Sequence, residues 1–136
     1  MLDVVVASDE AWVRDEVRSV LSGWPDLEVH EVTAGKAVLP AVLEYEPELV
    51  ILDLQIGSMG GMAACMDLRL EESADRVDHV PVLMLLDRRP DVFLARRAGA
   101  EGWVVKPLDP IRLRKAVQAL LDGGSYHDET YRPAAG

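Results

Sequence analysis

The sequence predicts an α/β domain in which helices cover both faces of a parallel sheet. Segments with the patterns of strands and helices alternate five times and are joined by short links. Three of the strand-like segments, at residues 2–7, 47–54 and 81–86, are nearly continuous apolar runs. A strand with one face in water would alternate apolar and polar residues, so these runs indicate strands buried on both faces. Buried strands that alternate with helices predict a parallel sheet.

The first strand and the first helix are expected within residues 2–21. The valine-rich run at 2–7 gives way to the acidic loop Ser8-Asp9-Glu10. After this loop, residues 11–21 place apolar side chains at helical spacing: Trp12, Val13, Val17, Val20 and Leu21. The segment Gly23-Trp24-Pro25 ends this helix.

Residues 27–45 predict an edge strand followed by a helix. In 27–32, apolar residues alternate with glutamate and histidine, the pattern of a strand with one exposed face. Residues 37–45 predict a helix in which Pro40, lacking an amide proton, marks the first turn or a kink. The densest apolar run follows at 47–54, and Asp53 lies where this strand leaves the core.

The second half of the chain continues the alternation. The expected elements are a glycine-rich loop at 54–61, a helix at 62–72, a strand at 81–86, a helix at 92–98, a strand at 102–105 and a helix that starts at Asp109 or Pro110. Gly123-Gly124 ends the last helix. Residues 123–136 show no periodicity, so we expect one domain at 1–122 followed by a flexible C-terminal tail.

Charge and composition limit the classes of partner. The formal net charge is -10 and the pI about 4.6, so the protein repels phosphate backbones, and we expect no nucleic-acid binding. No apolar run approaches the roughly 20 residues of a membrane helix, and we expect no membrane partner. The single Cys65 cannot form an internal disulfide, which suits a reducing compartment and a cytoplasmic protein.

Charged residues follow four of the predicted strands. Asp9, Asp53 and Asp87 lie at or just after three strand ends, and Lys106 follows a fourth. The carboxyl ends of parallel strands line one edge of a sheet, so these side chains could share one cleft. Carboxylates gathered in this way repel one another unless a divalent cation binds between them. The residues alone predict a small acidic metal site beside a lysine and leave the reaction open.

Four segments together resemble the receiver domain of bacterial response regulators, the signalling proteins of two-component systems. They are Val-Val-Val-Ala-Ser-Asp-Glu at 4–10, Leu-Val-Ile-Leu-Asp-Leu at 49–54, Met-Gly-Gly at 59–61 and Ala-Gly-Ala-Glu-Gly-Trp-Val-Val-Lys-Pro at 98–107. Each segment is weakly specific alone, but four in this order and spacing are specific. The resemblance covers about residues 2–122 and implies a flavodoxin-like doubly wound sheet of five strands in the order 2-1-3-4-5, with five helices.

The resemblance also implies the role of each charged residue. Asp53 corresponds to the aspartate that accepts a phosphoryl group from a histidine kinase or another phosphodonor, and Lys106 to the lysine that pairs with this group. Asp9, Asp53 and the backbone carbonyl of Gln55 correspond to ligands of Mg²⁺. The bond between Lys106 and Pro107 is expected to be cis. Such a domain is not an enzyme, beyond accepting the phosphoryl group and losing it slowly by autodephosphorylation.

Several residues depart from the family pattern. Ser8 replaces the first of two adjacent acids, so Mg²⁺ should bind more weakly. Leu86 replaces the Thr or Ser whose hydroxyl binds the phosphoryl group, and Asp87 adds a negative charge where a small residue is usual. Trp103 occupies the position of a Tyr or Phe that rotates on activation, and we expect it to serve in packing or in an interface. We therefore expect atypical switching.

Three hypotheses about function follow from these residues. The first is a single-domain receiver that is phosphorylated on Asp53 and acts by binding another protein. The second is a degenerate receiver that is never phosphorylated and serves as a constitutive scaffold. The third, a phosphatase of similar fold, is disfavoured because no second aspartate lies at position 55. Expected partners are a histidine kinase or phosphotransfer protein, an unidentified downstream protein, and a second copy in a weak homodimer through the face of the fourth helix, fifth strand and fifth helix.

Some candidate residues also have simpler interpretations. Asp9 could cap the first helix, and we give this role the same weight as metal binding. Asp87 is expected to be an exposed loop acid rather than a metal ligand. The three histidines are expected to be surface residues, and Cys65 a small buried apolar residue.

Overall fold

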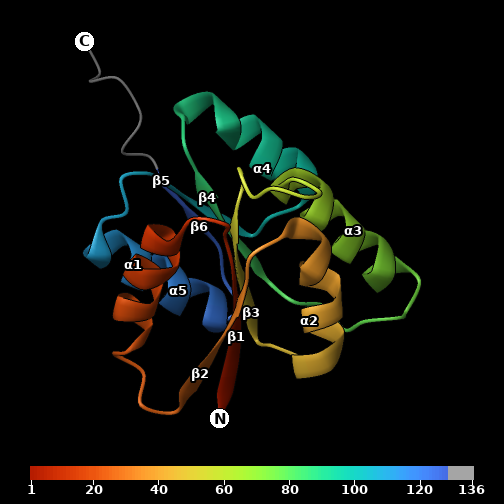
Figure 1. The fold of residues 1–136 in the computed structure, drawn as a ribbon, viewed down its shortest axis with the longest axis horizontal. Coiled ribbons are helices and arrows are strands. Elements are labelled where there is room, and N and C mark those ends of the chain that lie inside the picture. The colour runs from red at the N-terminus through yellow and green to blue at the C-terminus, as the bar shows by residue number, and fades with distance from the viewer. Residues whose placement is uncertain (129–136) are drawn as a thin grey trace.

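The computed structural model describes residues 1–128 and contains a parallel sheet between two layers of helices (Figure 1). Its strands are β1 (Leu2–Ala7), β2 (Leu27–Val32), β3 (Leu49–Asp53), β4 (Val82–Leu86), β5 (Gly102–Val105) and β6 (Tyr126–His127). All neighbouring strands are parallel, in the order β2-β1-β3-β4-β5-β6. The expected flavodoxin-like order 2-1-3-4-5 is confirmed, and one further strand extends the sheet beyond β5.

Five α-helices cover the sheet. They are α1 (Ala11–Leu21), α2 (Val38–Tyr45), α3 (Gly61–Ser73), α4 (Val92–Ala98) and α5 (Pro110–Leu121). Helices α1 and α5 lie on one face, and α2, α3 and α4 on the other (Figure 1). Pro40 is in the first turn of α2, where a missing N–H interrupts no hydrogen bond of the helix. None of the helices within residues 1–128 has the length and apolar composition needed to cross a bilayer.

The central strands are continuously apolar because they contribute to two cores. Val5 and Leu52 pack under α2, α3 and α4, whereas Val6 and Ile51 pack under α1 and α5. Successive side chains of a strand point to opposite faces, so every position of β1, β3 and β4 near the middle of the sheet meets a helix layer. Strand β2 lies at the edge and is only partly buried, as its alternating pattern predicted.

The expected tail at residues 123–136 is wrong for its first part. Gly123 adopts a positive φ of 85°, which reverses the chain after α5, and residues 126–127 then pair with β5. The N–H of Asp128 donates to the carbonyl of Trp103 at 3.2 Å. The folded unit therefore continues through Asp128, and the rest of the predicted tail, 129–136, lies outside the described residues. A two-residue strand carries no periodicity, so no local pattern could predict it.

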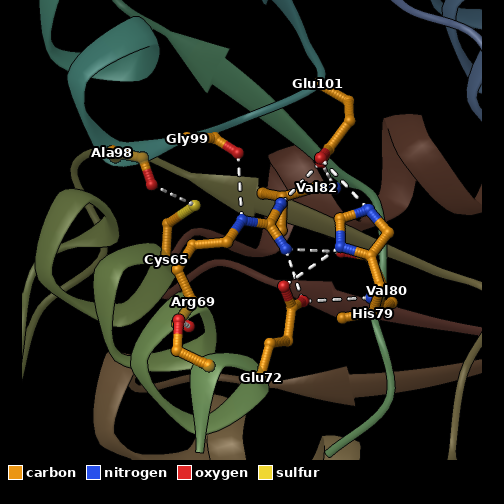
Figure 2. Close-up of polar contacts among 10 residues, drawn as sticks. Cys65, Arg69, Glu72, His79, Val80, Val82, Ala98, Gly99 and Glu101 are labelled. Carbon is orange, nitrogen blue, oxygen red and sulfur yellow. Dashed lines mark hydrogen bonds and ion pairs between the residues drawn. The ribbon is translucent and has the colours of Figure 1, made fainter.

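A charged network holds the start of β4 against α3 and β5 (Figure 2). The guanidinium of Arg69 contacts four groups: the carbonyls of Val80 (2.9 Å) and Gly99 (3.0 Å), and the carboxylates of Glu72 (2.6 Å) and Glu101 (2.5 Å). His79 bridges the same two carboxylates, with Nδ1 3.0 Å from Glu72 and Nε2 3.2 Å from Glu101. Nearby, burial raises the pKa of the Cys65 thiol to about 11. Cys65 is thus the buried, unreactive residue that was expected.

Candidate functional site

The four charged strand ends meet at the carboxyl edge of the sheet. Asp53 is the last residue of β3 and is fully buried. Lys106 follows β5, and its amino group reaches Asp53 and also Asp87, which follows β4. Asp9 follows β1 and contacts the loop after β3. The sequence prediction that distant positions come together is therefore correct for Asp53, Asp87 and Lys106.

Both carboxylate oxygens of Asp53 accept hydrogen bonds. Oδ1 accepts from the amino group of Lys106 at 3.0 Å and from the backbone N–H of Gln55 at 3.2 Å. Oδ2 accepts from the hydroxyl of Ser8 at 2.8 Å. A buried carboxylate is costly unless it is paired and hydrogen-bonded, and these three donors satisfy Asp53. Ser8 thus supplies a neutral hydroxyl where the family pattern has an acid.

Lys106 is held between two carboxylates. Its Nζ is 3.0 Å from Oδ1 of Asp53 and 2.6 Å from Oδ1 of Asp87, and its side chain is only 11% exposed. Burial alone would lower the pKa of Lys106, but the hydrogen bonds to Asp87 and Asp53 outweigh it and raise that pKa. Lys106 is therefore a cation that is already engaged by two anions. The bond between Lys106 and Pro107 is cis, as the resemblance implied.

Asp87 is the exposed loop acid that the sequence predicted, but it also pairs with Lys106. Its side chain is 40% exposed, but one carboxylate oxygen makes the shorter of the two contacts to Lys106. The neighbouring Leu86 is fully buried in the core under α2, α3 and α4 and offers no hydroxyl to the site. The end of β4 therefore contributes an anion where the family pattern has a neutral hydrogen-bond donor.

The candidate metal ligands are all oxygen donors. Asp9 is exposed, and its Oδ2 accepts from the N–H of Gly57 at 3.0 Å. The capping role is not observed, because α1 begins after Glu10 and has no side-chain cap. Two carboxylates and the carbonyl of Gln55 suit a hard cation such as Mg²⁺, with fewer charges than a site with a second acid at position 8. The donor chemistry therefore fits Mg²⁺.

A second cluster of metal-ligating groups lies away from this edge. Ligand atoms of Asp3, Glu28 and His30 lie within 4.8 Å of one another near the start of β1 and β2. His30 pairs with Asp3 at 2.9 Å and stacks on Tyr45 with ring centroids 3.7 Å apart. These contacts account for the position of the imidazole. The cluster belongs to the opposite part of β1 from Asp9 and takes no part in the candidate site.

The indole of Trp12 is a part of the site that the sequence did not reveal. Trp12 was assigned to the apolar stripe of the first helix, but it is 49% exposed, and the amino group of Lys106 lies 5.6 Å from its ring centroid. Its Nε1 donates to the carboxylate of Glu10. A tryptophan in the first turn after an acidic strand end is the signal that could have indicated this position.

Trp103 is buried rather than exposed, contrary to the expected interface role. Its side chain is fully buried, stacks on His127 with centroids 4.2 Å apart and planes 4° apart, and lies 5.3 Å from the Arg96 guanidinium. Its position opposite His127 follows from the pairing of β5 with β6. The packing role expected for Trp103 is confirmed. The interface role is wrong, because Trp103 is buried and stacks on His127 of β6, a strand that was not predicted.

The sheet order and the acidic strand ends with an opposed lysine define a flavodoxin-like domain of the receiver type. The family model of the response regulator receiver domain matches residues 4–118. The chain therefore belongs to the response regulator receiver domain family. Receiver domains are signalling domains of two-component systems; they generally bind Mg²⁺ at an acidic pocket and interact with histidine kinases and downstream effectors.

Individual relatives agree with this assignment. The DNA-binding response regulator MtrA of Mycobacterium tuberculosis (strain ATCC 25618 / H37Rv) is 32% identical over 120 residues, 87% of this chain and 50% of MtrA. The chain spans about half the length of the curated relatives it matches. Chemotaxis response regulator CheY4 of Vibrio cholerae has a TM-score of 0.76 and 25% identity, covering 88% of this chain and 98% of CheY4. The isolated receiver domain of RcsB from Salmonella enterica serovar Typhimurium has a TM-score of 0.80, covers 94% of both chains and, at 20% identity, supports the fold alone.

Proposed function

We propose that this chain is a receiver domain that accepts a phosphoryl group on Asp53. The observation that carries the proposal is the environment of Asp53, a fully buried carboxylate at the end of β3 with the Lys106 amino group at 3.0 Å. Phosphoryl transfer needs a nucleophilic oxygen and cations beside the phosphoryl oxygens, and little else from the protein. Asp53 and Lys106 supply these two requirements at the edge where ligands of such sheets bind.

The transfer exchanges one bond for another at phosphorus. A carboxylate oxygen of Asp53 bonds to phosphorus while the bond to the donor breaks, and the leaving atom of the donor keeps that electron pair. Lys106 pairs with the negative charge on the transferred group. Mg²⁺, held by the carboxylates of Asp9 and Asp53 and the carbonyl of Gln55, would offset further negative charge. The attacking oxygen gives up the hydrogen bond it accepts in the resting state, which for Oδ2 is the bond from Ser8.

Three features favour slow and incomplete phosphorylation. Lys106 is shared with Asp87, so part of its charge is already neutralised before a phosphoryl group arrives. Ser8 adds no negative charge for the metal, which favours weak Mg²⁺ binding. Leu86 offers no hydroxyl to bind the phosphoryl group, so the product lacks one stabilising contact. The phosphoryl group should therefore be acquired slowly and incompletely.

We infer that the output of the domain is protein binding in the cytoplasm. A histidine kinase or phosphotransfer protein would supply the phosphoryl group, and an unidentified downstream protein would read the state of the domain. The weak homodimer remains a prediction for the face of α4, β5 and α5. There, Phe93 and Ile111, which are 74% and 68% exposed, take the role first assigned to Trp103.

A constitutive scaffold is the second candidate function. It is favoured by the contact between Asp87 and Lys106, because this ion pair gives Lys106 a carboxylate partner without any phosphorylation. In that case Asp53 is a structural anion that holds Lys106 and Ser8 in place. Binding of the downstream protein would then be independent of Asp53 chemistry.

Intact mass measurement distinguishes the two functions. The protein and its Asp53→Asn variant would be incubated with acetyl phosphate and Mg²⁺, with omission of Mg²⁺ as a further control. We expect partial addition of one phosphoryl group to the native protein and none to the variant. A native protein that gains no mass, and that shows no Mg²⁺ binding by titration, would establish the scaffold function instead.

A further inference from the structure

The open edge of β5 is occupied by the chain's own C-terminal segment. Residues 126–128 lie along β5, where the N–H of Tyr126 donates to Glu101 at 3.4 Å and the N–H of Asp128 donates to Trp103 at 3.2 Å. The carboxylate of Asp128 accepts the N–H of Val105 at 2.9 Å. This segment, Tyr126-His127-Asp128, shows that the edge can hold an extended peptide by its main chain.

Side chains of the segment fit distinct positions on the edge. His127 stacks on Trp103, with the ring planes 4° apart. Asp128 is almost fully buried, and its carboxylate accepts the backbone N–H of Val105 at the end of β5. Tyr126 packs against the core under α1 and α5. The edge therefore selects an aromatic residue, a ring that stacks, and an acid, in that order.

The segment pairs with the edge over a short length. Strand β6 has two residues, and its main-chain bonds of 3.2 and 3.4 Å are at the long end of the normal range. Gly123-Gly124 joins it to α5, and a side chain at Gly123 would meet nothing within 4 Å. The indole Nε1 of Trp103 is buried and has no hydrogen-bond acceptor within residues 1–128. An occupant that supplied this acceptor would satisfy the edge better than β6 does.

We propose that the β5 edge is a docking site for an extended acidic segment of a partner protein, and that β6 is its intramolecular competitor. The basic side chains of Arg96 and Arg97 in the last turn of α4 suit an acidic partner on a protein whose net charge is -10. Because β6 is tethered, its effective concentration at the edge is on the order of millimolar. A partner must therefore outcompete β6 or bind when β6 is displaced. This proposal is independent of phosphorylation on Asp53.

The experiment uses the full chain and a peptide in trans. The probe is the acetylated peptide Gly-Gly-Ser-Tyr-His-Asp, the sequence of residues 123–128, added to the protein and to its Asp128→Ala variant. Asp122→Ala is the matched control, because this acid near the end of α5 contacts Gln118 and not β5. Backbone amide spectra report on Gly102 to Val105, and the indole N–H of Trp103 gives a separate signal.

We expect the peptide to bind Asp128→Ala at least tenfold more tightly than it binds the native protein or Asp122→Ala. The shifts should centre on β5, and a peptide with Asn in place of its Asp should bind more weakly. Unchanged signals of residues around Asp53 would show that the variant is folded. A folded Asp128→Ala variant that ignores the peptide at millimolar concentration would overturn the proposal. A concentration-dependent dimer of this variant in sedimentation would overturn the assigned partner, because it would make a second copy the occupant.

Discussion

Replacement of Asp87 by Asn should accelerate phosphorylation of Asp53. In the resting protein Asp87 and Asp53 share the single cation of Lys106, at 2.6 and 3.0 Å. The Asp87 side chain is 40% exposed, so its ion pair is worth only about 0.2–1 kcal/mol, the range of exposed pairs. Repulsion between Asp87 and an incoming phosphoryl group is screened by the same solvent and adds an amount of the same order.

Asp87→Asn removes both effects, which should lower the activation barrier for phosphorylation of Asp53 by about 1 kcal/mol. Since 1.4 kcal/mol corresponds to a factor of ten, the rate should rise about fivefold. The assay is the initial rate of mass increase with acetyl phosphate and Mg²⁺. Asp75→Asn is the matched control, because it removes one charge at the far end of β4 and Asn tolerates the positive φ of 57°. A rate for Asp87→Asn at or below the native rate would refute the reasoning and show that Asp87 positions Lys106.

Three further predictions concern switching, stability and pH. A beryllofluoride phosphoryl mimic should shift the amide signals near Asp9, Asp53 and Lys106 and leave those of α4 nearly unchanged. Leu86→Thr should extend the shifts to α4, because the added hydroxyl supplies a contact of about 1.5–3 kcal/mol. Native shifts that already reach α4 would contradict this. Arg69→Ala should lower the free energy of unfolding by about 2–3 kcal/mol in urea titrations, because it removes the guanidinium that pairs with both Glu72 and Glu101 and donates to two backbone carbonyls. Arg76→Ala breaks an exposed pair with Glu71 and should lower the free energy of unfolding much less. Equal losses for the two variants would count against the network. The raised pKa of Lys106 means that its stabilisation is complete below the unfolded lysine value of about 10.4 and is lost as pH rises through the folded value. The stability difference between native protein and Lys106→Gln should therefore shrink above that pH, and a difference that grows would reverse the assigned sign.

The sequence by itself determined the sheet and placed Asp53 and Lys106 at one edge of it. The continuous apolar runs could only be strands buried on both faces, and the strand-end rule then placed their terminal charges on one edge. These are strong signals because each depends on a whole element rather than on one side chain. The alternating pattern likewise identified β2 as the half-exposed edge, whereas only the structure decided that Pro40 lies in the first turn of α2 rather than at a kink.

Only the tertiary structure decided which charges and rings meet. Asp87 is exposed, as expected, but only the structure shows that the side chain of Lys106 reaches both it and Asp53. Trp103 was expected in packing or in an interface, and the structure buries it in a core whose edge is extended by β6, a strand of two residues. Such contacts depend on the length of side chains and on pairing between segments that are distant in the chain. Neither segment of such a pair has a local sequence pattern that predicts the contact. The positions of the helices and strands follow from periodicity. Which groups contact Lys106, and which segment pairs with the edge of β5, follow from three-dimensional packing alone.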